Sequence, residues 1–166
     1  MSLPSPLSIS DQAKLMQAEL QSWIAPYNGT AVIASNLRDM WNQAGSQAET
    51  PRILICFITE TPRGSIQMRT AYHRVDRLWT IAVTQGRGFY LQRGQGLYDN
   101  TTTQTPLYDA VEAVRDTVRA MQNISEETPM PDYDGTKAMQ LGNLIVDGYT
   151  VGIQTANDIP SNIYPH

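Results

Sequence analysis

The chain has 166 residues, enough for one domain with a real hydrophobic core, and 41% of them are apolar. Its 12 basic residues against 16 acidic ones give a net charge of −4, which argues against a domain that mainly neutralises nucleic-acid phosphates but leaves room for a local basic patch. Cys56 is the single cysteine and there are two histidines, which excludes an intramolecular disulfide and a cysteine-based zinc site.

The N-terminus predicts an arm followed by two helices. Residues 1–9 are rich in proline and serine and lack the features of a signal peptide, so we expect a soluble protein made in the cytosol. Ser10 is the expected N-cap of a helix that ends before Pro26 and whose apolar face is Ala13, Met16, Leu20 and Trp23. Residues 30–35 fit a strand or a packed loop, and residues 35–45 predict a second, short helix.

The middle of the chain predicts strands. Residues 51–60, "PRILICFITE", contain six apolar residues in a row, as in a buried strand, and Cys56 within them reads as a small buried hydrophobe. Residues 66–74 and 76–84 alternate between apolar and polar residues. In the second of these, Trp79, Ile81 and Val83 fall on one face.

The C-terminal third predicts the longest helix and a hairpin. Pro106 suits the first helical position, and apolar residues at helical spacing continue to about residue 122. The pair Asp147-Gly148 favours a two-residue turn in a β-hairpin, after which residues 159–166 form a tail.

Strands grouped apart from helices predict an α+β fold in a single domain covering residues 1–166. We expect a mostly antiparallel or mixed sheet covered on one face by the long helix, with N-terminal helices. The predicted core consists of Ile55, Phe57, Trp79, Ile81, Val111, Val114 and Val118.

A glycine-rich stretch, "GRGFYLQRGQG" at residues 86–96, resembles a phosphate-binding loop at first sight. In a dinucleotide fingerprint, however, the third small residue would stand where this chain has Leu91, and a helix would open directly after the loop. The chain also has no Gly-Lys pair, which a P-loop requires. We therefore expect a hairpin tip that exposes Arg87 and Arg93 to a partner.

Other candidate sites are weak. His73 is expected on the surface or across from a neighbouring strand, and Asp132, Asp134 and Gly135 read as a turn because the other ligands of a calcium loop are missing. Arg63, Arg69 and Arg74 could add to a modest basic patch. These parts build no reaction, so we expect no catalytic residue, no metal site and no cofactor.

Four segments together resemble the tail terminator (tail completion) proteins of long-tailed and Mu-like bacteriophages. They are "PRILICFI", "DRLWTIAVTQ", "PLYDAVEAVRDTVRAM" and "VDGYTVGIQ", within a resemblance over about residues 11–156. It implies a structural virion protein rather than an enzyme, located in the virion tail and assembled in the host cytoplasm. It also implies a homo-oligomer, a hexameric ring on the end of the tail tube, which ends tail polymerisation and offers a surface to the head connector.

The resemblance implies that the partners of such a ring are the tail tube protein and a head connector or neck protein. DNA would pass through the ring without sequence-specific binding, and no membrane would be involved. The expected interface residues are Gly86, Arg87, Gly88, Arg93, Gly94 and Gly96. Two alternatives remain open: another neck or head-tail joining protein, and a small nucleotide- or ligand-binding enzyme that uses the loop at residues 86–96.

Overall fold

The computed structural model describes residues 8–45, 50–62, 72–84, 106–120, 133–141 and 144–160. These ranges form the helices α1 (Ile9–Ile24), α2 (Leu37–Gly45) and α4 (Pro106–Ala120) and a 3-10 helix at Ala25–Tyr27. The strands are β1 (Thr30–Ile33), β2 (Arg52–Pro62), β3 (Tyr72–Thr84), β4 (Tyr133–Leu141) and β5 (Leu144–Pro160). No helix in these ranges is both long enough and apolar enough to span a membrane.

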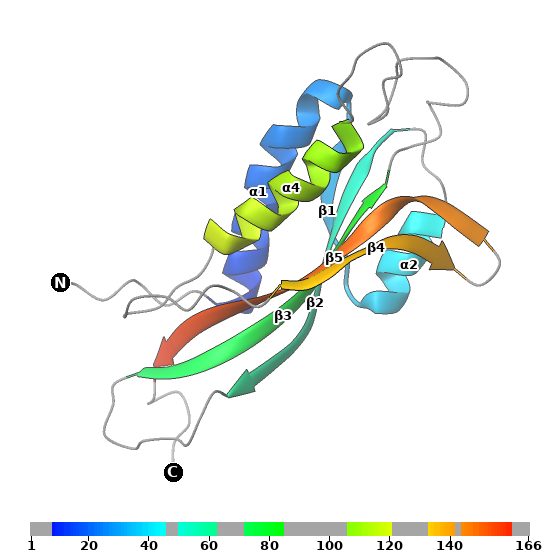
Figure 1. Ribbon diagram of the computed structural model, residues 1–166. Helices are drawn as coiled ribbons and strands as arrows, with labels where there is room; N and C mark the ends of the chain where they lie inside the picture. The colour runs from blue at the N-terminus through cyan, green and yellow to red at the C-terminus, as the bar shows by residue number, and fades with distance from the viewer. Residues whose placement is uncertain are drawn as a thin grey trace.

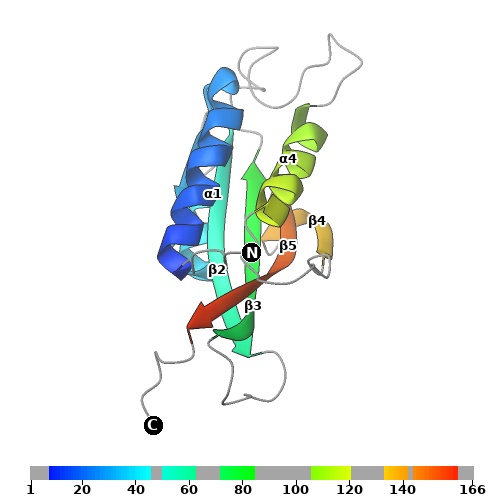
Figure 2. The ribbon, with the colours of Figure 1, turned by 90° about the vertical axis from the view of Figure 1, so that its left-hand side faces the viewer.

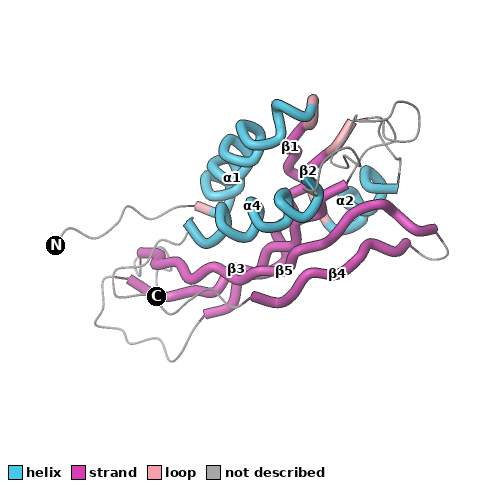
Figure 3. The backbone as a smooth tube through the Cα atoms, turned by 45° about the horizontal axis from the view of Figure 1, so that its top comes forward, coloured by secondary structure: helices cyan, strands magenta, loops and turns pink. Residues whose placement is uncertain are grey.

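The strands form one mixed sheet in the order β1-β2-β3-β5-β4. Only β1 and β2 run parallel, and the segment between them contains α2. The other three pairs of neighbours are antiparallel, and β3 and β5 are paired from Tyr72↔Pro160 to Thr84↔Gly148 (Figure 3). The predicted α+β class, with a mostly antiparallel sheet, is confirmed.

Helices lie on both faces of this sheet. α1 and α4 lie side by side on one face, with α1 over the β1–β2 side and α4 over β5 (Figures 1 and 2). The placement of the long helix across the sheet is therefore as expected. α2 lies on the opposite face (Figure 1), a location that the sequence pattern did not assign.

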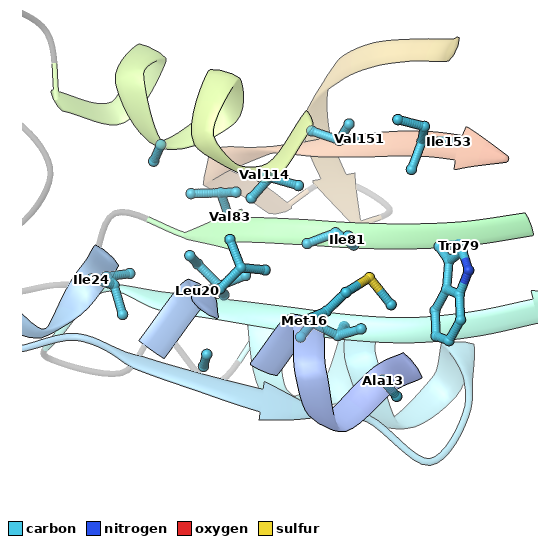
Figure 4. Packing of buried hydrophobic residues seen from close by; sticks show 14 residues of the cluster. Ala13, Met16, Leu20, Ile24, Trp79, Ile81, Val83, Val114, Val151 and Ile153 are labelled. Atoms are coloured by element: carbon cyan, nitrogen blue, oxygen red, sulfur yellow. The ribbon is translucent and has the colours of Figure 1, made fainter. Parts of the chain in front are cut away.

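The main core fills the space between the sheet and the pair α1 and α4 (Figure 4). Its fully buried members from α1 are Met16, Leu20 and Ile24, which face Ile81 and Val83 of β3. The predicted core is confirmed where it is described: Ile55, Trp79, Ile81 and Val114 are buried, and Phe57 and Val111 are partly buried against them. The side chain of Val118 lies outside the described part.

A second, smaller core lies between the sheet and α2. It contains Met40 and Ala44 of α2, Leu54 and Cys56 of β2, and Ala82 of β3. Because successive residues of a strand point to opposite faces, Leu54 and Cys56 reach this core while Ile53 and Ile55 reach the main one. Burial on both faces explains why β2 carries a continuous apolar run.

Three predicted boundaries are wrong. α1 begins earlier than expected: its N-cap is Ser8, whose Oγ accepts a hydrogen bond from the Asp11 backbone N–H at 3.0 Å, so the arm is shorter than residues 1–9. β5 continues to Pro160, so part of the expected tail belongs to the sheet. The segment Asp134–Gly135 lies in β4 and not in a turn.

The predicted hairpin exists, but its turn is not at Asp147-Gly148. β4 and β5 pair up to Leu141↔Leu144, so residues 142–143 connect them and Gly148 lies inside β5. A Cβ atom at Gly148 would stand 2.1 Å from the carbonyl oxygen of Val83. Glycine is required there because the backbones of β3 and β5 approach closely, and not because of a turn.

Candidate functional site

The predicted interface residues Gly86, Arg87, Gly88, Arg93, Gly94 and Gly96 lie outside the described residues. The strand that precedes them is described, and β3 is the central strand of the sheet. Its two edges are occupied by β2 and β5 along the strand. A subunit boundary at this place would therefore involve the Thr84 end of β3 and not one of its edges.

A buried polar cluster lies on the face of the sheet that α1 covers. It joins α1, β2, β3 and β5 through the side chains of Gln12, Glu60, Arg77, Trp79, Thr155 and Asn157. The strand register brings the members together, because Arg77 is directly opposite Glu60 on one side and Thr155 on the other.

Arg77 is the charged centre of this cluster and is only 2% exposed. Its Nε donates to Glu60 Oε2 at 2.8 Å, and its Nη1 donates to Gln12 Oε1 at 2.8 Å. The Glu60 side chain is 23% exposed, so water still reaches part of the carboxylate. A buried guanidinium is tolerated only with such partners, because its desolvation is costly.

Arg77 and Trp79 can only donate hydrogen bonds, and this determines the direction of the hydrogen bonds between the other members of the cluster. Arg77 can only donate, so Gln12 turns its oxygen toward Arg77 and its Nε2 toward Thr155 Oγ1, at 3.1 Å. Trp79 Nε1, also only a donor, lies 3.2 Å from the same hydroxyl oxygen. With both acceptor positions used, the Thr155 hydroxyl donates to Asn157 Oδ1 at 2.9 Å.

This arrangement joins α1 to β3 and β5 through side-chain hydrogen bonds. Each strong donor or acceptor at its centre is engaged by another member. Among the described residues, the Nδ2 of Asn157, the last member of this row of hydrogen bonds, is buried and has no hydrogen-bond partner. The cluster docks the first turns of α1 onto β3 and β5.

Sequence reasoning did not find this cluster, although one signal was present. The alternation in β3 places Arg77 on the same face as Trp79, Ile81 and Val83. A charged residue on the apolar face of a buried strand indicates a partner inside the protein. Gln12, next to the buried Ala13, carried a weaker signal of the same kind.

Cys56 is buried in the α2 core, as predicted for a small hydrophobe. Burial raises the pKa of its thiol, and the negative charge of Asp39 raises it further. Asp39 itself is held at the start of α2, where its carboxylate accepts a hydrogen bond from the Ser35 backbone N–H at 2.9 Å. The reactive thiolate form is therefore disfavoured at this position.

Two tyrosines meet where α4 begins over β5. The rings of Tyr108 and Tyr149 are arranged edge to face with centroids 6.0 Å apart, and Tyr108 is 57% exposed. A hydrogen bond with Tyr108 raises the pKa of Tyr149, with a smaller contribution from burial. Tyr149 is therefore not an activated hydroxyl, because an activated phenol would have a lowered pKa.

The remaining candidates are placed as follows. His73 lies in β3 opposite Ile159, a cross-strand position as expected. Arg74 follows it, half-buried, whereas Arg63 and Arg69 lie outside the described residues. Within the described ranges, His, Cys, Asp and Glu side chains form no group of three that could hold a metal ion.

Comparison with known proteins does not assign this chain to a family. No family model matches it, and no curated protein matches it. Among solved structures, it resembles full-length ShkA in complex with AMPPNP, at 12% identity and a TM-score of 0.37. The likeness covers 97% of this chain but only 33% of the ShkA chain, so this chain spans about a third of that protein's length. A similarity this low assigns neither fold nor function.

Proposed function

We propose that the protein is a structural virion protein that caps a bacteriophage tail tube, ends tail polymerisation and provides the surface for head attachment. The observation that carries the proposal is where the four resembling segments lie. They cover most of β2 and β3, all of α4 and about half of β5, and each contributes to the main core. The resemblance therefore follows the framework of the fold and not scattered surface stretches.

The polar cluster supports a structural role as well. Its side chains bind one another, join α1 directly to β3 and β5, and reach β2 through the Arg77–Glu60 pair, so they hold α1 in place on the sheet. A subunit that must hold its shape while it stacks on a tube benefits from such rigidity. The net charge of −4 also suits a ring through which DNA slides without binding.

In this proposal, six copies form a closed ring through one repeated heterologous contact. The glycine-rich loop, with Arg87 and Arg93, faces acidic residues of the next copy. Charges at such an interface mainly set register and association rate, and salt screens them.

The test begins with native mass spectrometry of the full chain, where a hexamer is expected, followed by co-sedimentation with tail tubes of the cognate tube protein. The double variant Arg87→Glu/Arg93→Glu should assemble less, and the loss should be larger at low salt than at high salt. The matched control is Lys14→Glu/Arg38→Glu, which changes the same amount of charge at two exposed positions on α1 and α2.

The outcomes separate the alternatives. A ring that binds a connector but not tube ends indicates another neck protein. A monomer that binds a nucleotide with micromolar affinity at residues 86–88 indicates the enzyme alternative. A wild-type chain that stays monomeric at high concentration and does not bind tubes contradicts the proposal.

A further inference from the structure

Among the strands that the structure describes, β1 is the outermost on one side of the sheet, and half of its backbone groups point away from β2. The backbone N–H groups of Thr30 and Ala34 donate toward β2, to Pro51 O at 3.1 Å and to Ile55 O at 2.8 Å. Because the bonded residues of a strand alternate, Ala31 and Ile33 present their N–H and C=O groups to the outer edge. Groups of this kind can pair with a strand of another molecule.

Two glutamines of α1 occupy this edge. The Ala31 N–H donates to Gln21 Oε1 at 2.8 Å, and Gln17 Nε2 donates to the Ala31 carbonyl oxygen at 3.0 Å. Gln21 Nε2 also donates to the carbonyl oxygen of Gly29, at 3.2 Å. Residues four apart lie on the same side of a helix, so both side chains reach β1 together.

A glutamine amide carries a donor and an acceptor, as a peptide group does. The pair Gln17 and Gln21 therefore gives Ala31 the bonds that a neighbouring strand would give. Farther along the edge, the chain exposes apolar surface: Ile33 is 37% exposed and Leu37, at the start of α2, is 43% exposed. An edge with free backbone groups beside apolar side chains favours strand addition.

We propose that Gln17 and Gln21 act as an edge guard, which prevents a second copy of this chain from pairing with β1. Without them, β1 would pair with β1 of another copy around a two-fold axis, and Ile33 and Leu37 would be covered. This inference goes beyond the proposed function and does not depend on it, because it concerns an association that the wild-type chain avoids.

The test compares the wild type with Gln17→Ala/Gln21→Ala by native mass spectrometry over a hundredfold range of protein concentration. The variant should form a species with twice the mass of the wild-type species, in increasing amounts as the concentration rises. The matched control is Glu19→Ala/Ser22→Ala, which changes two exposed residues of the same helix and should keep the wild-type mass.

Hydrogen exchange at the Ala31 amide gives a second readout. In the variant it should be at least tenfold faster than in the wild type at low concentration, and slow again at high concentration, when a second copy covers the edge. Gln17→Lys keeps a donor for the Ala31 carbonyl and adds an edge charge, so this variant should keep the wild-type mass.

Two results overturn the edge guard. One is a folded double variant with the wild-type mass and concentration-independent exchange at Ala31. The other is equal association by the Glu19→Ala/Ser22→Ala control. If the double variant does not fold, Gln21→Ala alone decides by the same two measurements, since it removes the acceptor of the Ala31 N–H and leaves the bond from Gln17 Nε2 in place.

Discussion

Replacing Glu60 with leucine tests the account of the buried cluster, because among the described residues it leaves Gln12 as the side-chain partner of the Arg77 charge. Arg77 is only 2% exposed, so water does not replace the lost carboxylate. Removing one partner of a buried ion pair costs about 3–5 kcal/mol. Since Glu60 is 23% exposed, we expect the lower end, about 3 kcal/mol of unfolding free energy.

The reciprocal change, Arg77→Met, should cost less. It removes the buried charge itself, and the carboxylate of Glu60 can turn toward water. The main loss is the donor to Gln12 Oε1, so we expect about 1–2 kcal/mol. The double variant Glu60→Leu/Arg77→Met should then be at most about 1 kcal/mol less stable than Arg77→Met alone, since no charge is left unpaired.

Urea unfolding followed by circular dichroism, at one fixed protein concentration, measures all three variants against the wild type. Glu60→Leu should also lower Tm by about 6–12 °C in a domain of this size. The reasoning fails if Arg77→Met is more destabilising than Glu60→Leu, or if the two single costs simply add in the double variant. Either result would mean that the ion pair is not the central element of the cluster.

Three further predictions rest on other contacts. Gly148→Ala should destabilise the protein by at least about 2 kcal/mol in the same urea assay, because the added Cβ meets the Val83 carbonyl oxygen; an unchanged midpoint would contradict the described approach of β3 and β5. Cys56 should react with a thiol reagent only as fast as the protein unfolds, and at the rate of a free thiol in strong denaturant, because burial raises its pKa and covers it; fast reaction in the native state would place it elsewhere. In NMR titrations of ¹³C-labelled tyrosine, Tyr149 should lose its proton at higher pH than an ordinary tyrosine, and Tyr108→Phe should bring this pKa down. Because the folded-state pKa of Tyr149 is raised, the stabilisation from this hydrogen bond is complete below the ordinary tyrosine pKa and is lost as the pH rises through the raised value. An unaltered Tyr149 titration in the Tyr108→Phe variant would exclude the hydrogen bond as the cause of the shift.

The periodicity of apolar residues in the sequence was enough to predict the helices and strands with a strong apolar pattern. The spacing of Ala13, Met16 and Leu20 predicted the buried face of α1, and alternation placed Trp79 and Ile81 on one face of β3. These predictions succeeded because burial of apolar side chains acts residue by residue, so the pattern shows which face of each element is inside. Pro106 marked the start of α4 for an equally local reason.

The tertiary structure decided what depends on residues far apart in the chain. The choice between a turn and a strand at Gly148 depended on the backbone of β3, which the local dipeptide Asp-Gly does not reveal. The partners of Arg77 come from α1 and β2, and only the register of the sheet and the docking of α1 bring them within hydrogen-bond distance. Sequence records the preference of each residue for burial and for backbone shape, whereas a polar contact needs two particular atoms at a set distance and angle. That geometry exists only once the sheet and the helices are packed.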